Sequence, residues 1–269
     1  MRKTRTSVII PSYNEKFYLE KCLLALFKQE VPVQEIIVVD NNTADDSIDR
    51  ARKKFPKVLF LEEKNQGIVF ARNTGFDAAS GDILVKLDAD SIVTPSWHAN
   101  LLETIGEFDG WSGHVASSEL NPRFSATAIW VFNFIIFKTN KIVAGTPLLL
   151  GANMAITKGA WSEIRGDLIM RNDILEDTDM SIAMADKDLN ITNSSYRGAM
   201  ISARSGNTPL KLMYARTFGM TRVFWLRRKW FSAAKSVVNQ HVTIVCWLIL
   251  KPLALFGRKP NKRPRPEQY

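Results

Sequence analysis

The 269-residue chain has little cysteine and little histidine, with two residues of the first kind and three of the second. Cys22 and Cys246 lie far apart, each within an apolar stretch, so the sequence indicates neither a disulfide framework nor a cysteine-based zinc site. His98, His114 and His241 show no metal-ligand spacing among themselves. We therefore expect two buried thiols in a reducing compartment.

Long apolar runs are also missing. Val242–Leu250 is followed directly by Lys251 and Pro252, and Phe124–Phe137 is also too short for a membrane-spanning helix, which needs roughly 20 residues. We expect the second run to form a helix that partly touches lipid. The basic N-terminus is not followed by an apolar signal core with a cleavage site, which argues against secretion.

Acidic residues are absent from a long stretch near the C-terminus. Residues 189–266 contain 15 Lys and Arg and no Asp or Glu, which leaves 21 basic against 27 acidic residues in the rest of the chain. A strongly basic extension on a weakly acidic body suggests an anionic partner. A membrane surface, a nucleic acid and the phosphates of a substrate all fit this description.

Aromatic and basic residues alternate within Phe218–Lys235. They are Phe224, Trp225, Trp230 and Phe231 among Arg222, Arg227, Arg228, Lys229 and Lys235. The pattern predicts a helix in the headgroup region of a bilayer, where its cations meet anionic lipids. The alternative is an ordinary amphipathic helix packed on the body of the protein. The basic, proline-rich tail 257–269 is expected to be disordered.

Short apolar runs alternate with helical patterns along the first part of the chain. The predicted strands are Ser7–Ile10, Glu35–Val39, Val58–Leu61 and Ile83–Leu87, and the predicted helices are Phe17–Gln29, Asp45–Phe55 and Gly67–Ala79. This order predicts an α/β, Rossmann-like fold with a mostly parallel central sheet flanked by helices. Ligands of such sheets bind beyond the carboxyl ends of the strands. Four polar segments fall there: Pro11–Glu15, Asp40–Thr43, Asn65–Gly67 and Asp88–Asp90.

Two carboxylates follow the last of these strands. Asp88 and Asp90 are separated by one residue, and a turn at this point can aim both side chains at one spot. Neighbouring carboxylates repel each other, so the arrangement usually implies a divalent cation between them. The alternative is a solvated turn with both side chains facing water.

Other polar residues near the strand ends suit a nucleotide. Asp40 could accept hydrogen bonds from a nucleobase edge, or it could cap the next helix. Arg72 suits an anionic ligand, or it could form a surface salt bridge. Gly67 and Gly75 lack the lysine-serine pair of a P-loop, which disfavours that type of phosphate cradle.

A second acidic block, Glu176-Asp177, precedes the apolar helix predicted over Met180–Ala185. Acidic side chains are common at helix N-termini, where they interact favourably with the helix dipole. A carboxylate here could instead act as a general base, if the fold brings it opposite Asp88 and Asp90.

Six ordered segments resemble the motifs of family 2 glycosyltransferases, which have the GT-A fold. They are Val8–Glu15, Val38–Asp45, Asn65–Gly75, Asp88–Asp90, Gly151–Asn153 and Glu176–Asp177. The resemblance covers about Thr6–Asp188. It departs from the family at Asn41, where a second aspartate is usual, and this departure leaves the base and ribose contacts open.

The resemblance implies a role for each matching residue. The nucleotide would be bound by Pro11, Tyr13, Glu15, Asp40, Asn65, Gly67, Arg72 and Asp88. Asp88 and Asp90 would hold Mg²⁺ or Mn²⁺, with Asp90 as the more direct ligand. Acceptor and sugar would be contacted by Gly151, Ala152 and Asn153. Asp177 would be the catalytic base, and Glu176 would help to position the acceptor.

The resemblance also implies an activity. We expect an inverting, metal-dependent transferase, hexosyltransferase-like (EC 2.4), that moves a sugar from a nucleotide-sugar to a hydroxyl acceptor. UDP-sugar is the default donor, and GDP- or dTDP-sugars stay open. The hypothesis for the acceptor is a lipid-linked or membrane-surface molecule in glycan or cell-envelope polysaccharide synthesis. The alternatives are an Asp-x-Asp phosphatase and a non-catalytic basic module that binds membrane or nucleic acid.

The expected organisation has three parts. Residues 1–205 form the GT-A domain, with a nucleotide-binding half (about 1–118) and an acceptor half (about 119–205). Residues 206–256 form a basic, aromatic helical segment that associates with a membrane, and 257–269 form the tail. We expect a cytoplasmic protein that is peripheral on the inner face of the cell membrane and has no nucleic-acid partner.

Overall fold

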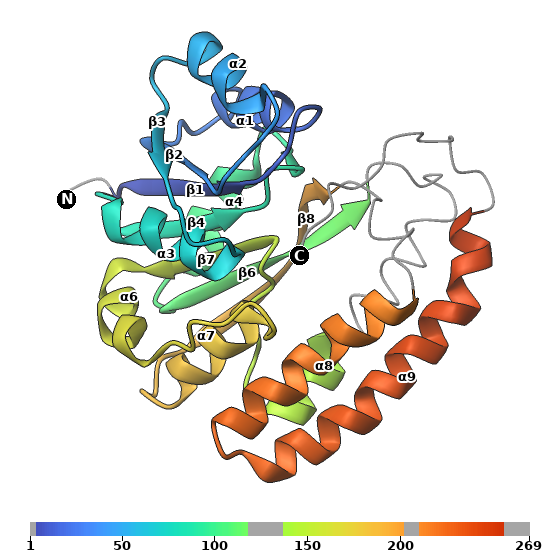
Figure 1. Ribbon diagram of the computed structural model, residues 1–269. Coiled ribbons are helices and arrows are strands. Elements are labelled where there is room, and N and C mark those ends of the chain that lie inside the picture. The colour runs from blue at the N-terminus through green and yellow to red at the C-terminus, as the bar shows by residue number, and fades with distance from the viewer. Residues whose placement is uncertain (1–3, 118–136, 202–209, 256–269) are drawn as a thin grey trace.

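The computed structural model describes residues 4–117, 137–201 and 210–255, and its centre is an eight-stranded sheet in the order β3-β2-β1-β4-β7-β6-β8-β5 (Figure 1). The strands are β1 (Thr6–Ser12), β2 (Glu35–Asp40), β3 (Leu59–Glu62), β4 (Ile83–Leu87), β5 (Ile92–Val93), β6 (Gly110–Ser117), β7 (Asn153–Thr157) and β8 (Ile191–Ile201).

Helices cover both faces of this sheet. One face carries α1 (Leu19–Phe27), α2 (Ser47–Lys54) and α4 (Trp97–Ile105), and the other carries α3 (Ile68–Ala78), α6 (Lys158–Ile164) and α7 (Glu176–Ala185). Side chains of a strand alternate between its two faces, so Val8 and Ile10 belong to the first core and Ile9 to the second. The α/β fold with a central sheet flanked by helices is therefore confirmed.

The first four strands pair in parallel, as predicted. β4 has the bounds expected from its apolar run, and all five of its residues are buried. β8 is harder to predict, because the polar residues 192–195 interrupt its apolar pattern. The predicted helix over Phe17–Gln29 is shorter, because α1 begins at Leu19 and ends at Phe27.

Beyond β4 the sheet changes direction. β7 pairs antiparallel with both β4 and β6, and this pairing places Asn153 opposite Leu87 at the end of β4. β7 starts at Asn153, because Gly151 and Ala152 form a turn. The antiparallel pairing therefore brings this turn beside the residues that follow β4.

The C-terminal part is a helical hairpin of α8 (Leu210–Leu226) and α9 (Trp230–Leu255). The single helix predicted over Phe218–Lys235 is wrong, since the chain turns between Leu226 and Trp230, and Arg228 adopts a left-handed backbone with φ of 57°. α8 lies between α9 and α7 (Figure 1). It packs through an apolar cluster that includes Ile182, Val223 and Phe224.

Within the described residues, no helix combines the length and the apolar character needed to cross a bilayer. The tail 257–269 and all but the last residue of the predicted apolar run Phe124–Phe137 lie outside the described residues.

Candidate functional site

The loops after β1, β2 and β3 are joined by side chains of the second loop. Asn41 is buried and donates its amide hydrogens to the carbonyls of Glu63 and Asn65, both at 2.8 Å, while its Oδ1 accepts from the Gly67 N–H at 2.7 Å. An ionised aspartate has no hydrogen to donate to either carbonyl. The departure at Asn41 therefore serves to hold the loop that leads into α3.

Asp40 is partly exposed at the end of β2. Its Oδ1 accepts from the Thr43 N–H at 2.9 Å, so the carboxylate caps a tight turn rather than helix α2, whose N-cap is Asp46. Pro11 and Tyr13 are also partly buried, at the end of β1 and in the loop after it. The nucleotide contacts of these residues stay a prediction.

Two more residues of the predicted nucleotide set have structural roles in these loops. The Glu15 side chain is buried, and its carbonyl accepts from the N–H groups of Tyr18 and Leu19 at the start of α1. Asn65 is exposed and donates to the Glu63 carboxylate. Their contacts with a nucleotide likewise stay a prediction.

Asp88 and Asp90 follow β4 as expected. Burial raises the pKa of Asp88, and the charge of Asp90 raises it further, while the ammonium of Lys86 opposes both effects. The unfavourable effect of the neighbouring Asp90 charge on ionised Asp88 fits a site for a divalent cation. Among the described residues, no group of three or more Asp, Glu, His or Cys side chains is placed to hold a metal. The pair fits a Mg²⁺ or Mn²⁺ ion that takes its other ligands from phosphates and water.

Lys86 is the central residue that the sequence analysis missed. Its Nζ lies 2.9 Å from Asp88 Oδ1, 3.2 Å from Glu176 Oε1 and 2.7 Å from the carbonyl oxygen of Gly151. Burial alone would lower the pKa of Lys86, but the two carboxylates raise it above its usual value, so the side chain stays charged. The available signal was a lysine inside the otherwise apolar β4, because buried lysines are almost always paired.

Arg72 approaches Glu176 from the other side. Its Nη1 lies 3.5 Å from Glu176 Oε2 and 3.3 Å from the Glu176 carbonyl oxygen, and its Nε and Nη2 donate to Asn73. Arg72 is fully buried, so the alternative of a surface salt bridge is wrong. Its proximity to a nucleotide stays a prediction.

The two neighbouring acids of α7 have opposite electrostatic environments. Burial raises the pKa of Glu176, but Lys86 and Arg72 outweigh it, and the net pKa is lowered. For Asp177, burial and the adjacent Glu176 charge raise the pKa to about 6. Glu176 is therefore a fixed anion, whereas Asp177 can take up and release a proton near neutral pH.

Asp177 is held by backbone groups. Its Oδ2 accepts from the Gly151 N–H at 2.9 Å, and its Oδ1 accepts from the Thr178 N–H at 2.7 Å. A Cβ on Gly151 would lie 3.1 Å from Asp177 Oδ2 and 3.2 Å from Lys86 Nζ. A side chain at this position would press on these groups, so glycine suits the close approach of the backbone.

The predicted acceptor segment is mostly enclosed. Gly151 is buried, and Asn153 is fully buried with its Oδ1 accepting from the Trp97 indole N–H at 3.0 Å. Ala152 is partly exposed. Contact of this segment with an acceptor stays a prediction. Of its three residues, Ala152 is the one whose exposure allows such a contact.

Three segments far apart in sequence thus meet at one place: the end of β4, the turn before β7 and the start of α7. Lys86 contacts all three. The Asp88 side chain and the start of α7 therefore lie close together, as a catalytic role for Asp177 opposite Asp88 would require.

Comparison with known proteins agrees with this geometry. The family model described as Glycosyl transferase family 2 matches residues 7–160, more than half of the chain. The chain belongs to this family. Glycosyltransferase AglE of Haloferax volcanii is 38% identical over 105 residues, which are 37% of this chain and 34% of that protein. Putative glycosyltransferase EpsH of Bacillus subtilis is 31% identical over 110 residues, 40% of this chain and 32% of that protein. The chain thus matches about a third of the length of these curated relatives.

Solved structures show the same fold. A mannosyltransferase from Pyrobaculum calidifontis, in complex with GDP-Man and Mn²⁺, has a TM-score of 0.66 at 19% identity and covers 95% of this chain and 79% of that one. Glucosyl-3-phosphoglycerate synthase from Mycobacterium tuberculosis, in complex with Mn²⁺, UDP and phosphoglyceric acid, has a TM-score of 0.62 at 17% identity. The match covers 84% of this chain and 78% of the synthase chain. The GT-A fold is therefore shown.

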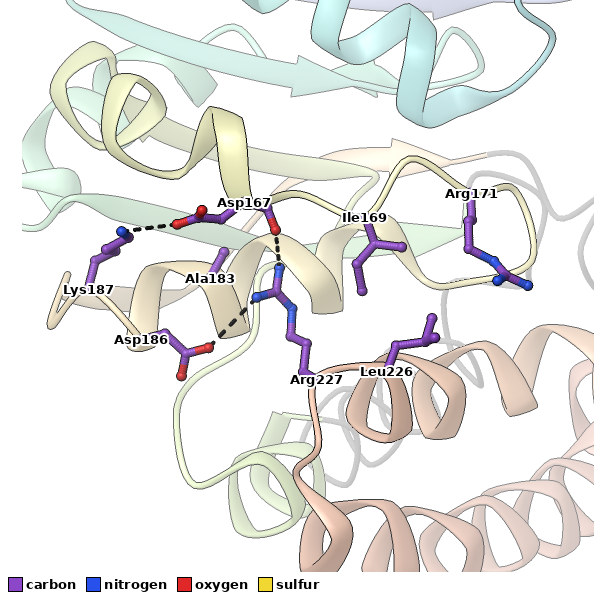
Figure 2. Close-up of a pocket in the computed structure, with 8 residues that line it drawn as sticks. All are labelled: Asp167, Ile169, Arg171, Ala183, Asp186, Lys187, Leu226 and Arg227. Atoms are coloured by element: carbon purple, nitrogen blue, oxygen red, sulfur yellow. Dashed lines mark hydrogen bonds and ion pairs between the residues drawn. The ribbon is translucent and has the colours of Figure 1, made fainter.

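A pocket of about 590 Å³ lies on the other side of α7, where the helix meets the hairpin (Figure 2). Arg227 extends into it from the end of α8 and lies 2.6 Å from Asp179 Oδ1, 3.0 Å from the Asp167 carbonyl oxygen and 3.7 Å from Asp186 Oδ2. Asp179 is buried, so this ion pair anchors the hairpin to the helix that carries Asp177.

Proposed function

We propose that the protein is an inverting, metal-dependent glycosyltransferase that moves a hexose from a nucleotide-sugar to a hydroxyl acceptor. The observation that carries the proposal is the environment of Asp177. Its carboxylate has a pKa of about 6, and the Gly151 amide and Lys86 link it to the Asp88 side of the site. A proton acceptor beside a pair of metal-binding carboxylates is the arrangement that glycosyl transfer needs.

Asp177 would act on the acceptor. It takes the proton of the acceptor hydroxyl while that oxygen forms a bond to the anomeric carbon of the sugar. The bond from the anomeric carbon to the diphosphate oxygen breaks, and its electron pair leaves with the nucleoside diphosphate. Attack opposite to the leaving group inverts the anomeric carbon. Glu176, ionised between Lys86 and Arg72, holds its position and does not exchange a proton.

Mg²⁺ or Mn²⁺ bound at Asp88 and Asp90 would supply positive charge to the diphosphate as it leaves. Asp90 is the better candidate for a direct ligand, because Asp88 Oδ1 is already engaged by Lys86. Support for a divalent ion comes from the Mn²⁺ in the two similar structures described above.

UDP-sugar is the donor that we propose, with Asp40 on the base. The partly exposed Asp40 carboxylate, next to the partly buried Pro11 and Tyr13, supports a nucleoside site at the ends of β1 and β2. GDP- and dTDP-sugars are the competing donors, and the similar structures include one with UDP and one with GDP-Man.

The proposal can be tested with nucleoside diphosphates. Thermal-shift measurements with UDP, GDP and dTDP, each with and without Mn²⁺, should show stabilisation by one nucleotide that requires the metal. Hydrolysis of a nucleotide-sugar panel should then depend on Mn²⁺ and disappear in Asp90→Ala. Metal-independent binding without turnover would instead favour the non-catalytic module. Hydrolysis of phosphate monoesters with loss in Asp88→Asn would favour the phosphatase.

We also propose that the hairpin binds an anionic membrane surface, as a peripheral protein on the inner face of the cell membrane. Ser236 and Gln240 of α9 are buried against α8, and each contacts Thr221 Oγ1 at 2.7 Å. The same seam also buries apolar side chains of both helices, among them Val223, Phe224 and Ala233.

The outer face of α9 is apolar. Phe231, Val238, Val242 and Val245 share one side of the helix, and 87% of Phe231 and 65% of Val238 is exposed. The position of the hairpin supports this face as the one that meets lipid, because α8 separates it from the body of the protein (Figure 1). Trp225 and Trp230 are exposed near the turn, where interfacial aromatic residues belong.

The prediction that the basic residues of the hairpin meet anionic lipids needs a correction. Arg222, Arg227 and Lys229 form ion pairs with Asp173, Asp179 and Asp186, so their charges are largely balanced within the protein. The exposed Arg228 and Lys235 are the better candidates for contact with anionic headgroups. A lipid-linked acceptor in cell-envelope polysaccharide synthesis would suit this location.

Flotation with anionic vesicles tests the membrane proposal. The triple variant Val238→Asn, Val242→Asn, Val245→Asn should lose most vesicle binding, and a control triple at exposed positions elsewhere, Leu24→Asn, Leu59→Asn, Phe108→Asn, should keep it. Equal flotation of the two triple variants would reject this surface. Substitution is preferable to deletion, because α8 covers apolar residues of α7.

A further inference from the structure

We propose that Lys86 is a positioning residue that sets the geometry between the two sides of the transfer site. The proposal rests on the transferase function above. Lys86 would act by fixing the Asp88 side chain, the turn at Gly151 and the start of α7 relative to one another, without contacting donor or acceptor.

The three contacts of Lys86 use the full hydrogen-bonding capacity of an ammonium group. A lysine has three N–H donors, and Nζ has one acceptor from each segment within 3.2 Å: Asp88 Oδ1, Glu176 Oε1 and the Gly151 carbonyl oxygen. The acceptors at Gly151 and Glu176 belong to chain segments 65 and 90 residues from Lys86, whereas Asp88 is two residues away. A single side chain therefore joins the metal side of the site to the base side.

The contact with Gly151 extends this control to the base itself. The Gly151 carbonyl accepts from Lys86, and the N–H of the same residue donates to Asp177 Oδ2. A movement of the Gly151 turn would therefore move the carboxylate that takes the proton. A Cβ at position 151 would meet Asp177, Glu176 and Lys86 at 3.1 to 3.2 Å, so the turn has little space in which to shift.

Lys86 is too deeply buried to bind substrate directly. Its side chain is 2% exposed, whereas that of Asp88 is 35% exposed. The Asp88 carboxylate thus lies between the ammonium and the solvent, with Oδ1 directed to Lys86. Lysine is also hard to replace with arginine here, because a planar guanidinium does not present its donors in three diverging directions.

The test compares Lys86→Met with Lys158→Met. Methionine keeps the unbranched shape and removes the donors, and Lys158 serves as an exposed lysine control whose Nζ donates to the Ala79 carbonyl. We expect kcat of Lys86→Met to fall about 100-fold, the loss that a displacement of about 1 Å can produce. The affinity for UDP with Mn²⁺, measured by calorimetry, should stay within about threefold of the wild type, and Lys158→Met should keep both values.

Two results would overturn the proposal. In the first, kcat of Lys86→Met stays within about threefold of kcat of Lys158→Met. In the second, Lys86→Met loses UDP–Mn²⁺ binding in proportion to its loss of kcat, which would assign Lys86 to the nucleotide and not to the alignment of the two sides.

A second variant tests the proposal if Lys86→Met does not fold. Lys86→Met leaves Asp88 and Glu176 without their shared cation, which can unfold the protein. The double variant Lys86→Met, Glu176→Gln removes one positive and one negative charge together, and we expect it to fold with kcat as low as the single variant. Wild-type kcat in the double variant would show that Lys86 only neutralises Glu176, and the proposal would fail.

Hydrogen exchange separates this proposal from the transferase function. If the wild-type protein transfers no sugar, the proposed function fails, and amide exchange then decides the role of Lys86. Lys86→Met should speed exchange at the Gly151 and Thr178 amides, which donate to Asp177, and Lys158→Met should not. Unchanged exchange at both amides in Lys86→Met would overturn the positioning role.

Discussion

The proposed transfer site and the C-terminal hairpin both bury polar groups, but these groups have different roles in the two regions. At the site, Lys86, Arg72, Glu176 and Asp177 form a charged network enclosed by the sheet and α7. In the hairpin, neutral Ser236 and Gln240 share the seam with buried apolar side chains, and further apolar side chains of α9 are exposed. The first arrangement holds charges where chemistry needs them, whereas the second leaves an apolar surface for a partner.

The two regions also differ in how α7 connects to them. The N-terminus of α7 carries Glu176 and Asp177, and the side of the helix farther along carries Asp179 and Asp186, which bind Arg227 and Lys229 of the hairpin. One helix therefore carries the proposed base and the anchor of the proposed membrane surface. The predictions below separate these two roles.

The largest effect is expected at the base. Asp177→Asn should lower kcat by about 10²–10⁴-fold, the usual contribution of a general base, while UDP–Mn²⁺ affinity is retained. Asp186→Asn is the control on the same helix and should leave kcat within about threefold. Steady-state kinetics and calorimetry on both variants would measure this, and an active Asp177→Asn would remove the proposed mechanism.

A steric effect on both activity and stability is expected at Gly151. In Gly151→Ala the new methyl group would press on Asp177, Glu176 and Lys86, and we expect a loss of about 1–3 kcal/mol in the free energy of unfolding together with lower kcat. Gly159→Ala has only Thr157 Oγ1 near its Cβ, at 3.9 Å, and should be neutral. Urea denaturation and initial rates give both quantities. Equal behaviour of the two variants would show that the turn has room to adjust.

Loss of the ion pair between Arg227 and Asp179 should affect the free energy of unfolding more than kcat. Arg227→Ala leaves the buried Asp179 without its cation, and we expect a loss of about 3–5 kcal/mol in the free energy of unfolding. The neighbouring Arg228 is exposed, so Arg228→Ala should change stability by no more than about 0.5 kcal/mol. Chemical denaturation of the two variants would test this. Similar stability would mean that the hairpin is held by its apolar contacts alone.

The smallest effect is the pH dependence. Because burial and Glu176 raise the pKa of Asp177 to about 6, the base is protonated below this pH, and kcat should fall about tenfold per pH unit there and level off above it. Glu176, with its lowered pKa, should add no step near pH 6. A pH–rate profile without an acid limb near 6 would contradict the assignment.

The raised pKa of Asp177 also predicts that stability depends on pH, with the opposite sign to the dependence of kcat. The folded protein holds the Asp177 proton up to about pH 6, whereas the unfolded chain loses it near pH 4. The contribution of Asp177 to stability should therefore decrease as the pH rises through this interval.

Much of the fold was predictable because its signals are local. The apolar run Ile83–Leu87 predicted β4 with its observed bounds, and the polar residues after β1, β2 and β4 marked the edge where the site forms. Asp88 and Asp90 were recognisable from one short segment. Each of these signals lies within a few consecutive residues.

The missed features depend on distant partners. Lys86 could be read as a member of a strand, but its contacts with Gly151 and Glu176 arise only from the antiparallel pairing of β7 with β4. Arg227 looked like a lipid contact because its acidic partners lie more than 40 residues earlier in the chain. Charge counted along a sequence does not show which charges are neutralised in space.

The most direct test of the account is the position of the metal. A crystal structure with UDP and Mn²⁺, with the ion located by anomalous scattering, should place Mn²⁺ at about 2.0–2.6 Å from a carboxylate oxygen of Asp90 or Asp88, with the diphosphate between the ion and Asp177. An ion bound away from both carboxylates, or a nucleotide on the far side of α7 from Lys86, would contradict it.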